Sequence, residues 1–305
     1  MSNYFDLQVN GYGGIDFNRE GLTADELHTA CEYLQRDGVA GILATIVTEH
    51  LPQMEGRLRR LVELRERDPL AQKLISGLHI EGPFINPEKG YRGAHPEDAI
   101  VPAELGAMRG LLEAAGGLTR VVTLAPELDA NFAVTHYLAE QGIVVSAGHC
   151  GPSLEVLRDS IDAGLSMFTH LGNGCPMMCN RHDNIVQRVL SLSDRLWICF
   201  IADGAHIPWP ALKNYIRLVG PERAIVVTDA IAPAGLGPGN YTVARWKLTI
   251  GEDLIARAPD GSHLVGAAMN MPRVERNLCE HLGLSVEQVY QLTSVNPRRA
   301  LRMLP

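Results

Sequence analysis

The sequence has little continuous hydrophobicity: in 305 residues no stretch approaches about 18 uninterrupted apolar positions. A transmembrane helix needs roughly that length, so we expect no membrane span. The first residues, MSNYFDLQVNG, also lack the basic segment followed by an apolar core that forms a secretory signal. We therefore expect a cytoplasmic protein with no membrane partner.

Positive charge is also scarce. Lys and Arg number 27 against 35 Asp and Glu, which gives a formal net charge of -8. Nonspecific nucleic-acid binding depends on clustered Lys and Arg, so this balance argues against a nucleic-acid partner. A local basic pocket for an anionic metabolite stays compatible with it.

Cysteine is sparse and scattered. The chain has 6 cysteines, spread along its length rather than packed into a short segment, so we expect free thiols. Cys175, Cys179 and His182 do cluster in CPMMCNRH. Three ligands in one loop fall short of the four that a structural zinc site uses, and ordinary loop packing is the preferred interpretation.

Eight short apolar segments rich in β-branched residues recur along the chain. They span residues 4–10, 38–47, 73–80, 119–126, 142–149, 165–171, 196–204 and 224–230. Segments with helical spacing of apolar residues lie between them, and two of these open with the N-capping residues Thr23 and Ser153. Buried strands that alternate with helices predict a parallel sheet, and eight such units predict an α/β fold of the (β/α)8 TIM-like type.

The chain shows no linker, internal repeat or low-complexity tract. Residues 1–305 are therefore predicted to form a single barrel domain, for which about 250 residues are typical. Residues 237–265 depart from the alternating pattern, with Gly-Pro breaks and the alternating run YTVARWKLTI. They predict a β-hairpin insertion after the eighth strand.

Polar residues of metal-binding or acid/base types stand at the ends of the predicted strands. They are Gln8, Asn10, Thr45, Glu81, Glu127, His149, His170, Asp203, His206 and Asp229. The carboxyl ends of barrel strands meet at one mouth, so Glu81, His149 and His170 should converge there. Two imidazoles and one carboxylate with an open position form the ligand set of a catalytic zinc.

Seven ordered motifs carry a family resemblance. They are LHIEGPF, KGYRGAH, VSAGH, FTHLGNG, IADGAH, VVTDA and LVGAAMNM. Over nearly the whole chain they resemble the N-acetylglucosamine-6-phosphate deacetylases of the amidohydrolase superfamily. The resemblance implies Glu81, His149 and His170 as metal ligands. It further implies Asp229 as the catalytic acid/base and His95 as the group that polarises the substrate carbonyl.

The same resemblance implies residues for substrate binding. Arg181 and His206 match residues that contact the sugar phosphate in the family, and Asn173 and Gly174 match residues that hold the same ligand. In family members the Arg comes from the neighbouring subunit, which implies a homodimer. The loop CNRHDN around Arg181 differs from the usual family loop.

Two further features follow from the resemblance. Gln8 and Asn10 stand where many amidohydrolases carry a His-x-His pair for a second metal, and members with Gln-x-Asn use one metal. One divalent ion is therefore expected, with Zn2+ as the default and Fe2+, Co2+ or Mn2+ open. Relatives also carry a β-sandwich domain built from segments before the first barrel strand and after the last helix. Here the first predicted strand begins at residue 4 and the sequence stops after TSVNPRRALRMLP, so a variant without that domain is expected.

The implied reaction removes the acetyl group from N-acetylglucosamine 6-phosphate and gives glucosamine 6-phosphate and acetate. Three alternatives stay open. The substrate could be an unphosphorylated or differently substituted N-acetyl amino sugar. The barrel could bind amino-sugar phosphates without catalysis. A binuclear hydrolase of cyclic amides would need a His-x-His pair and a Lys at the end of the fourth strand, where this chain has Glu127.

Overall fold

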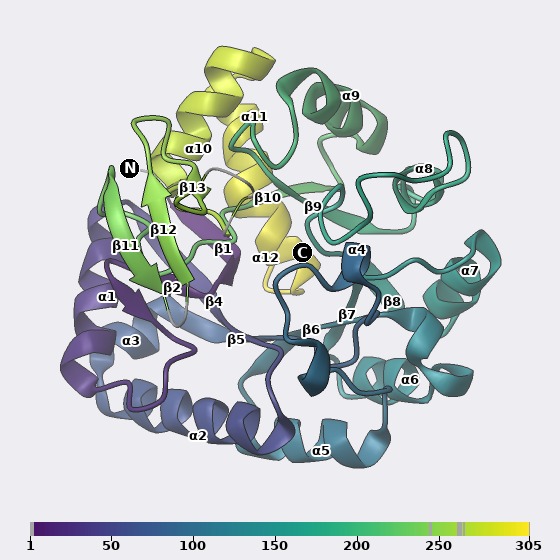
Figure 1. Ribbon diagram of the computed structural model, residues 1–305, viewed down its shortest axis with the longest axis horizontal. Helices are drawn as coiled ribbons and strands as arrows, with labels where there is room; N and C mark the ends of the chain where they lie inside the picture. Colours follow the sequence, from purple (N-terminus) through teal and green to yellow (C-terminus); the bar gives the residue numbers. More distant parts are fainter. Residues whose placement is uncertain (1–2, 244–245, 261–263, 265, 305) are drawn as a thin grey trace.

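The computed structural model describes residues 3–243, 246–260, 264 and 266–304 (Figure 1). Its centre is an eight-stranded sheet in the order β1-β4-β5-β6-β7-β8-β9-β10, and each neighbouring pair is parallel. The strands are β1 (Tyr4–Val9), β4 (Val39–Val47), β5 (Ile75–Glu81), β6 (Thr119–Leu124), β7 (Val144–Ala147), β8 (Leu165–Phe168), β9 (Trp197–Ile201) and β10 (Ala224–Val227). Each lies within or overlaps one of the eight predicted segments, so the prediction of a TIM-like α/β barrel is confirmed.

The first and last strands close the barrel through an isolated bridge and side-chain hydrogen bonds. Val9 and Ala230 form a parallel bridge, and the backbone N–H of Asn10 donates to the carbonyl oxygen of Ala230 at 2.7 Å. The carboxylate of Asp6 accepts from the backbone N–H of Thr228 at 3.2 Å and from its hydroxyl. Burial raises the pKa of Asp6 to about 7. This seam brings the end of β1 beside the residues that follow β10.

Helices surround the sheet. The longer ones are α1 (Ala24–Arg36), α2 (Leu51–Arg67), α5 (Leu105–Ala114), α6 (Ala133–Glu140), α7 (Leu154–Asp162) and α9 (Trp209–Val219). The shorter ones are α3 (Pro69–Leu74), α4 (Lys89–Arg92), α8 (Ile185–Leu190), α10 (Met271–Asn277), α11 (Val286–Tyr290) and α12 (Asn296–Ala300). Further helical turns are η1 (Glu97–Ala99), η2 (Pro126–Leu128), η3 (Ala130–Phe132), η4 (Leu278–Leu282) and η5 (Gln291–Val295).

Both predicted N-caps are confirmed, since the side chains of Thr23 and Ser153 accept from backbone N–H groups of the first turn. Among the described residues, no helix combines the length and the apolar character that crossing a membrane requires.

Alternate residues of the strands supply two separate apolar layers. In β10, Ala224 and Val226 belong to the cluster that the surrounding helices share, whereas Ile225 and Val227 belong to a second cluster inside the barrel. Ala300 of α12 packs against that interior cluster. Because both faces are buried, the strand sequences are mostly apolar, and many polar residues stand at or just beyond the carboxyl ends.

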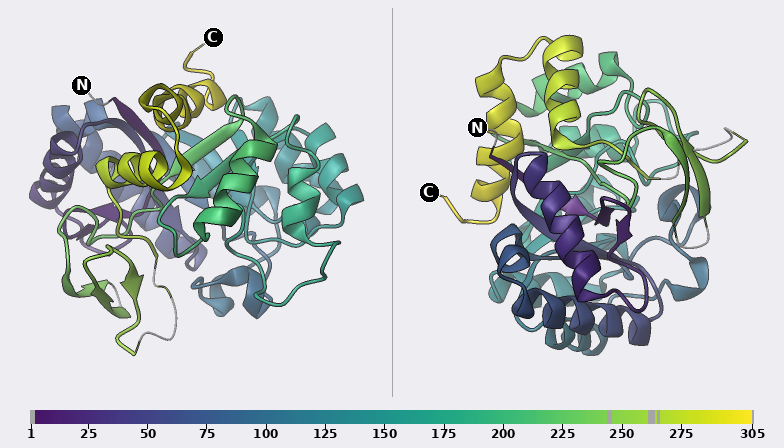
Figure 2. Two further views of the ribbon diagram at one scale, coloured as in Figure 1. Left: turned by 90° about the horizontal axis from the view of Figure 1, so that it is seen from above. Right: turned by 90° about the vertical axis from the view of Figure 1, so that its left-hand side faces the viewer.

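The predicted insertion after the eighth strand is confirmed as a small antiparallel sheet, which is larger than a hairpin. It contains β11 (Gly239–Val243), β12 (Trp246–Ile250) and β13 (Ala256–Arg257). Positions 244, 245, 261–263 and 265 of the predicted segment lie outside the described residues. A second small sheet joins β2 (Gly11–Tyr12) to β3 (Ile15–Asp16). Figure 2 shows the β11–β13 sheet at the opposite end of the barrel from the two chain termini.

Gly82 follows the end of β5 in a conformation that suits glycine alone. Its φ is 83°, and an added Cβ would overlap the hydroxyl oxygen of Thr48. We expect Gly82→Ala to lower the free energy of unfolding by about 3 kcal/mol, because a left-handed backbone and a steric clash add. Gly21 has a φ of 75° with no atom within 4 Å of an added Cβ, so Gly21→Ala should cost only about 1 kcal/mol. Urea unfolding measures the free energy of unfolding of both variants. Equal losses of stability in Gly82→Ala and Gly21→Ala would contradict the steric argument.

Candidate functional site

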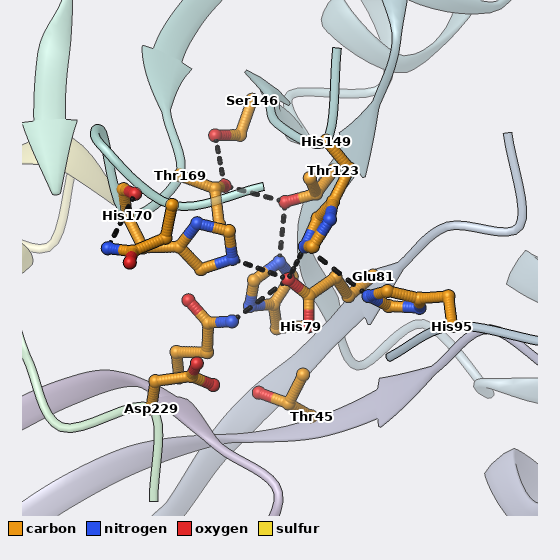
Figure 3. Close-up of polar contacts among 12 residues, drawn as sticks. Thr45, His79, Glu81, His95, Thr123, Ser146, His149, Thr169, His170 and Asp229 are labelled. Carbon is orange, nitrogen blue, oxygen red and sulfur yellow. Dashed lines mark hydrogen bonds and ion pairs between the residues drawn. The ribbon is translucent and has the colours of Figure 1, made fainter. Parts of the chain in front are cut away.

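The three residues predicted as metal ligands meet at the barrel mouth (Figure 3). Glu81 ends β5, and His149 and His170 each follow a strand, β7 and β8, by two residues. The Nε2 atoms of His149 and His170 lie 3.3 and 3.0 Å from Oε1 of Glu81. All three side chains are buried. The structure therefore brings the predicted set together, while its role in binding a metal stays a prediction.

Three of the proposed site residues share an uncommon backbone conformation. His149, His170 and Asp229 have φ angles of 52°, 32° and 51°. Each follows the end of its strand by two residues, so the same left-handed turn recurs after β7, β8 and β10. Residues with a Cβ adopt this region rarely, and such strain tends to gather at functional sites. The turns direct these side chains into the mouth.

A backbone carbonyl in α4 fixes the tautomer of His149. Its Nδ1 lies 2.8 Å from the carbonyl oxygen of Tyr91, which can only accept, so Nδ1 carries the hydrogen. In the neutral ring Nε2 then directs a lone pair at Oε1 of Glu81. Two acceptor atoms 3.3 Å apart repel each other unless a proton or a cation lies between them. The donor set therefore fits a divalent metal, and Tyr91 supplies the outer hydrogen bond that metal-binding histidines commonly have.

His95 enters the same mouth from the loop between α4 and η1. Its Nε2 lies 3.3 Å from Nε2 of His149, and ligand atoms of Glu81, His95 and His149 all lie within 4.8 Å of one another. Burial, with the neighbouring imidazole of His149, lowers the pKa of His95 to about 3, so the His95 ring is neutral. It lies where it could act as a further ligand or donate to a bound carbonyl.

The two carboxyl groups of the mouth differ in their electrostatics. Burial alone would raise the pKa of Glu81, but the adjacent imidazoles of His149 and His170 lower it well below the usual range. The pKa of His170 is raised, since its pairing with Glu81 outweighs burial. Burial, with the charge of Glu81, raises the pKa of Asp229 to about 6. One carboxylate thus suits a cation, and the other suits proton exchange near neutral pH.

The two amides at the end of β1 hydrogen-bond these carboxylates. Nε2 of Gln8 donates to Oε1 of Glu81 at 3.0 Å, and Nδ2 of Asn10 donates to Oδ1 of Asp229 at 2.7 Å. These residues were predicted as the remnant of a second metal site. Neutral amides that donate to the carboxylates orient them without adding ligands of their own, which fits one cation better than two.

Asn173 and Gly174, predicted to bind substrate, lie beside the backbone of His170 and the imidazole of His149. Nδ2 of Asn173 donates to the carbonyl oxygen of His170 at 3.3 Å. Gly174 has a φ of 60°, and an added Cβ would lie 2.8 Å from Nδ1 of His149. Both residues therefore belong to the wall of the mouth.

The two residues predicted to contact a phosphate differ in their placement. Nδ1 of His206 lies 2.6 Å from Oδ2 of Asp203, whose Oδ1 accepts from the backbone N–H groups of Ala205 and His206. Burial would raise the pKa of Asp203, but the hydrogen bond and charge of His206 lower it. Arg181 is exposed, and within the described part of the chain its guanidinium has no hydrogen-bond or ion-pair partner. The structure does not join Arg181 to the other site residues.

The comparisons with known proteins agree with this geometry. The chain is 32% identical over 308 residues to the N-acetylglucosamine-6-phosphate deacetylase of Homo sapiens, covering 98% of this chain and 73% of that protein. It is 29% identical over 298 residues to the N-acetylglucosamine-6-phosphate deacetylase of Bacillus subtilis, covering 97% and 74%. The chain belongs to the N-acetylglucosamine-6-phosphate deacetylase family. No family model matches it. It is also 29% identical over 299 residues to the N-acetylgalactosamine-6-phosphate deacetylase of Escherichia coli O157:H7, covering 98% and 77%.

Solved structures of this deacetylase family share the fold. The chain superposes with a TM-score of 0.86 on a mutant of the Mycobacterium smegmatis deacetylase in complex with N-acetyl-D-glucosamine-6-phosphate, at 28% identity and covering 99% of this chain and 77% of that one. The Thermotoga maritima deacetylase gives a TM-score of 0.85 at 26% identity, covering 99% and 79%. The predicted family, matched along almost all of this chain but only part of the relatives, is confirmed.

The loop that contains Cys175, Cys179 and His182 is more exposed than the sequence predicts. All six cysteines are free thiols, as predicted. Cys175 is half-buried, whereas Cys179 and His182 are exposed, and the three form no metal-like group with neighbouring ligand atoms among the described residues. Met177 and Met178 are 98% and 90% exposed. The loop is therefore less packed than expected.

Sequence reasoning missed a buried polar group beneath the deacetylase-type site. His79, Thr123, Ser146 and Thr169 form a chain of hydrogen bonds inside the barrel. Burial lowers the pKa of His79 to about 4. A signal for His79 was present, because a residue two positions before Glu81 on one strand points to the same face. The other members, Thr123, Ser146 and Thr169, lie in or next to three other strands. No local sequence pattern identifies them as partners of His79.

Proposed function

We propose that this chain is a metal-dependent hydrolase that removes the acetyl group from N-acetylglucosamine 6-phosphate, giving glucosamine 6-phosphate and acetate. One observation carries the proposal. The carboxylate of Glu81 contacts the imidazole nitrogens of His149 and His170, and a second, half-buried carboxyl, Asp229, stands beside them at the same mouth. The activity for which the relatives are named supports the substrate.

Glu81, His149 and His170 would hold one divalent ion, with Zn2+ as the default. When bound, such an ion polarises an amide carbonyl and lowers the pKa of water that attacks it. Asp229 accepts a proton from the attacking water and then delivers it to the amine nitrogen, because an unprotonated amide nitrogen is a very poor leaving group. His95 donates a hydrogen bond to the carbonyl oxygen as its negative charge develops.

The sugar phosphate is proposed to lie against Asn173, Gly174, Arg181 and His206. Because Asp203 binds Nδ1 of His206, the other ring nitrogen is left for a ligand. The exposure of Arg181 suits a residue that completes the site of a second subunit, so we include a homodimer in the proposal. In this proposal residues 1–305 act as one catalytic domain in the cytoplasm.

A second substrate has support from one relative. The N-acetylgalactosamine-6-phosphate deacetylase of Escherichia coli O157:H7 matches as much of this chain as the human relative does. The two phosphorylated sugars differ only in the configuration at carbon 4. The acetamide, the phosphate and the hydrolytic chemistry are common to both.

The decisive experiment compares substrates. The full chain, loaded with Zn2+, is given N-acetylglucosamine 6-phosphate, N-acetylgalactosamine 6-phosphate and unphosphorylated N-acetylglucosamine at equal concentrations, and acetate release is followed. We expect kcat/KM for the preferred phosphorylated sugar to exceed that of the unphosphorylated one by about 100-fold or more, because phosphate contacts are lost. Equal rates for N-acetylglucosamine with and without the phosphate would remove the phosphate-binding role of Arg181 and His206. Release from none would contradict the hydrolase proposal.

The rate should depend on pH through Asp229. Burial raises the pKa of this group to about 6, and only its ionised form can accept a proton. We therefore expect kcat/KM to fall as the pH drops through about 6, by about tenfold per pH unit below it. Acetate release between about pH 8 and pH 4.5, with circular dichroism as a check on folding, measures this. A flat profile over that range would assign the proton transfer elsewhere.

A further inference from the structure

Four buried polar side chains form a connected layer directly beneath the proposed metal site, and we call them the hydroxyl chain (Figure 3). Nε2 of His79 lies 2.7 Å from Oγ1 of Thr123, which lies 2.8 Å from Oγ1 of Thr169. Oγ1 of Thr169 in turn lies 2.6 Å from Oγ of Ser146. All four residues are at most 2% exposed. Burying so many polar groups is unfavourable unless each is paired, and the proposed reaction uses none of them.

The hydroxyl chain is built from the strands that carry the proposed ligands. Its members precede those ligands closely: His79 stands two residues before Glu81, Ser146 three before His149, and Thr169 directly before His170. Thr123 on β6 connects them, and its carbonyl oxygen accepts from the backbone N–H of Gly82 at 3.0 Å. A shift of any one strand end would therefore break a contact within the chain.

The hydrogen bonds have one consistent direction. Nδ1 of His79 lies 3.1 Å from the carbonyl oxygen of Leu7, which only accepts, so Nδ1 is a donor. The neutral ring then accepts at Nε2 from Thr123, which accepts from Thr169, which accepts from Ser146. Each of the three hydroxyl groups then donates one hydrogen bond within the chain. In the reverse direction Ser146 would need another acceptor, and within the described chain its hydroxyl contacts none.

Close packing couples the hydroxyl chain to the two histidine turns. An added Cβ on Gly148 would lie 2.7 Å from Cγ2 of Thr123 and 3.0 Å from Cβ of Thr169. Gly148 directly precedes His149, and Thr169 directly precedes His170, and both histidines have positive φ. Strained turns of this kind persist only where their surroundings hold them. The hydroxyl chain is the surface on which both turns are packed.

We propose that the hydroxyl chain positions Glu81, His149 and His170 at the spacing that a divalent metal requires. Its members touch neither the substrate nor the reacting atoms, so they act through the ligands. The inference rests on the proposed function only for the identity of the metal-binding residues. It needs no particular sugar.

The test removes one hydroxyl in the middle of the chain. Thr123→Val keeps the shape and deletes the hydroxyl, whereas Thr123→Ser keeps the hydroxyl. The Zn2+ affinity of the purified full chain is measured by competition with a chromophoric chelator, alongside Tm, kcat and KM. We expect Thr123→Val to weaken Zn2+ binding by about 10- to 100-fold, as loss of outer-shell partners commonly does, and to lower kcat with KM within about threefold. Thr123→Ser should retain the wild-type affinity within about threefold.

A distant threonine provides the matched control. Thr293 lies in η5 and is fully buried, and its hydroxyl donates to the carbonyl oxygen of Val289 at 2.8 Å. Thr293→Val should lower Tm as Thr123→Val does but leave the Zn2+ affinity within about twofold. Unchanged Zn2+ affinity in Thr123→Val, or an equal loss in Thr293→Val, would overturn the proposal. If the wild-type chain binds Zn2+ but releases no acetate, the proposed function fails, and the Zn2+ affinities still decide the positioning role.

Discussion

Asp229→Asn is expected to lower kcat for acetate release by about 1000-fold, which is within the usual contribution of a general acid/base. The amide of Asn fills the same space but can neither accept a proton from water nor deliver one to the amine. Asp229 is suited to this task because burial, with the charge of Glu81, raises its pKa to about 6. Asn10 holds one of its oxygens at 2.7 Å and leaves the other for the substrate.

Steady-state kinetics with the phosphorylated sugar measure this loss, and Zn2+ content shows whether the site itself is intact. The variant should bind Zn2+ within about threefold of the wild type, since Asp229 is not one of the proposed ligands. Asp98→Asn offers a matched control, because that carboxylate is 78% exposed and pairs with His50 at the surface. A kcat for Asp229→Asn within about tenfold of wild type would transfer the acid/base role to another group.

Removal of the metal is expected to abolish acetate release, with restoration on adding Zn2+. Glu81→Gln should weaken Zn2+ binding by about 100-fold or more, because the carboxylate is the one negatively charged member of the proposed ligand set. The same substitution also takes away the partner of His170, whose raised pKa depends on the carboxylate. The loss in kcat/KM at limiting Zn2+ should exceed about 1000-fold.

Chelator treatment, Zn2+ titration and acetate release together check this expectation. Glu49→Gln is a suitable control, since Glu49 also lies beyond a barrel strand but pairs with Arg57 at 3.4 Å. It should retain Zn2+ binding and activity within about twofold. Full activity in the chelated protein, or wild-type Zn2+ affinity in Glu81→Gln, would exclude the proposed metal site.

Local sequence patterns predicted much of the scaffold. Strands buried on both faces are mostly apolar, so β10 was visible as the run AIVV. The caps at Thr23 and Ser153 were visible because a capping side chain bonds within its own first turn. The strand ends could be inferred because the apolar runs stop at polar residues. Once eight strands are accepted, the barrel geometry places Glu81, His149 and His170 at one mouth without any further information.

The sequence by itself determined the eight-stranded barrel and the residue types gathered at its mouth, since both follow from periodicities of a few residues. Only the tertiary structure decided how those residues face one another. It set the left-handed turns at His149, His170 and Asp229. The hydrogen bond from His149 to the carbonyl oxygen of Tyr91 and the hydroxyl chain join segments far apart in the sequence. Such contacts depend on strand register and on side-chain packing across the barrel. Neither feature produces a local pattern in the sequence.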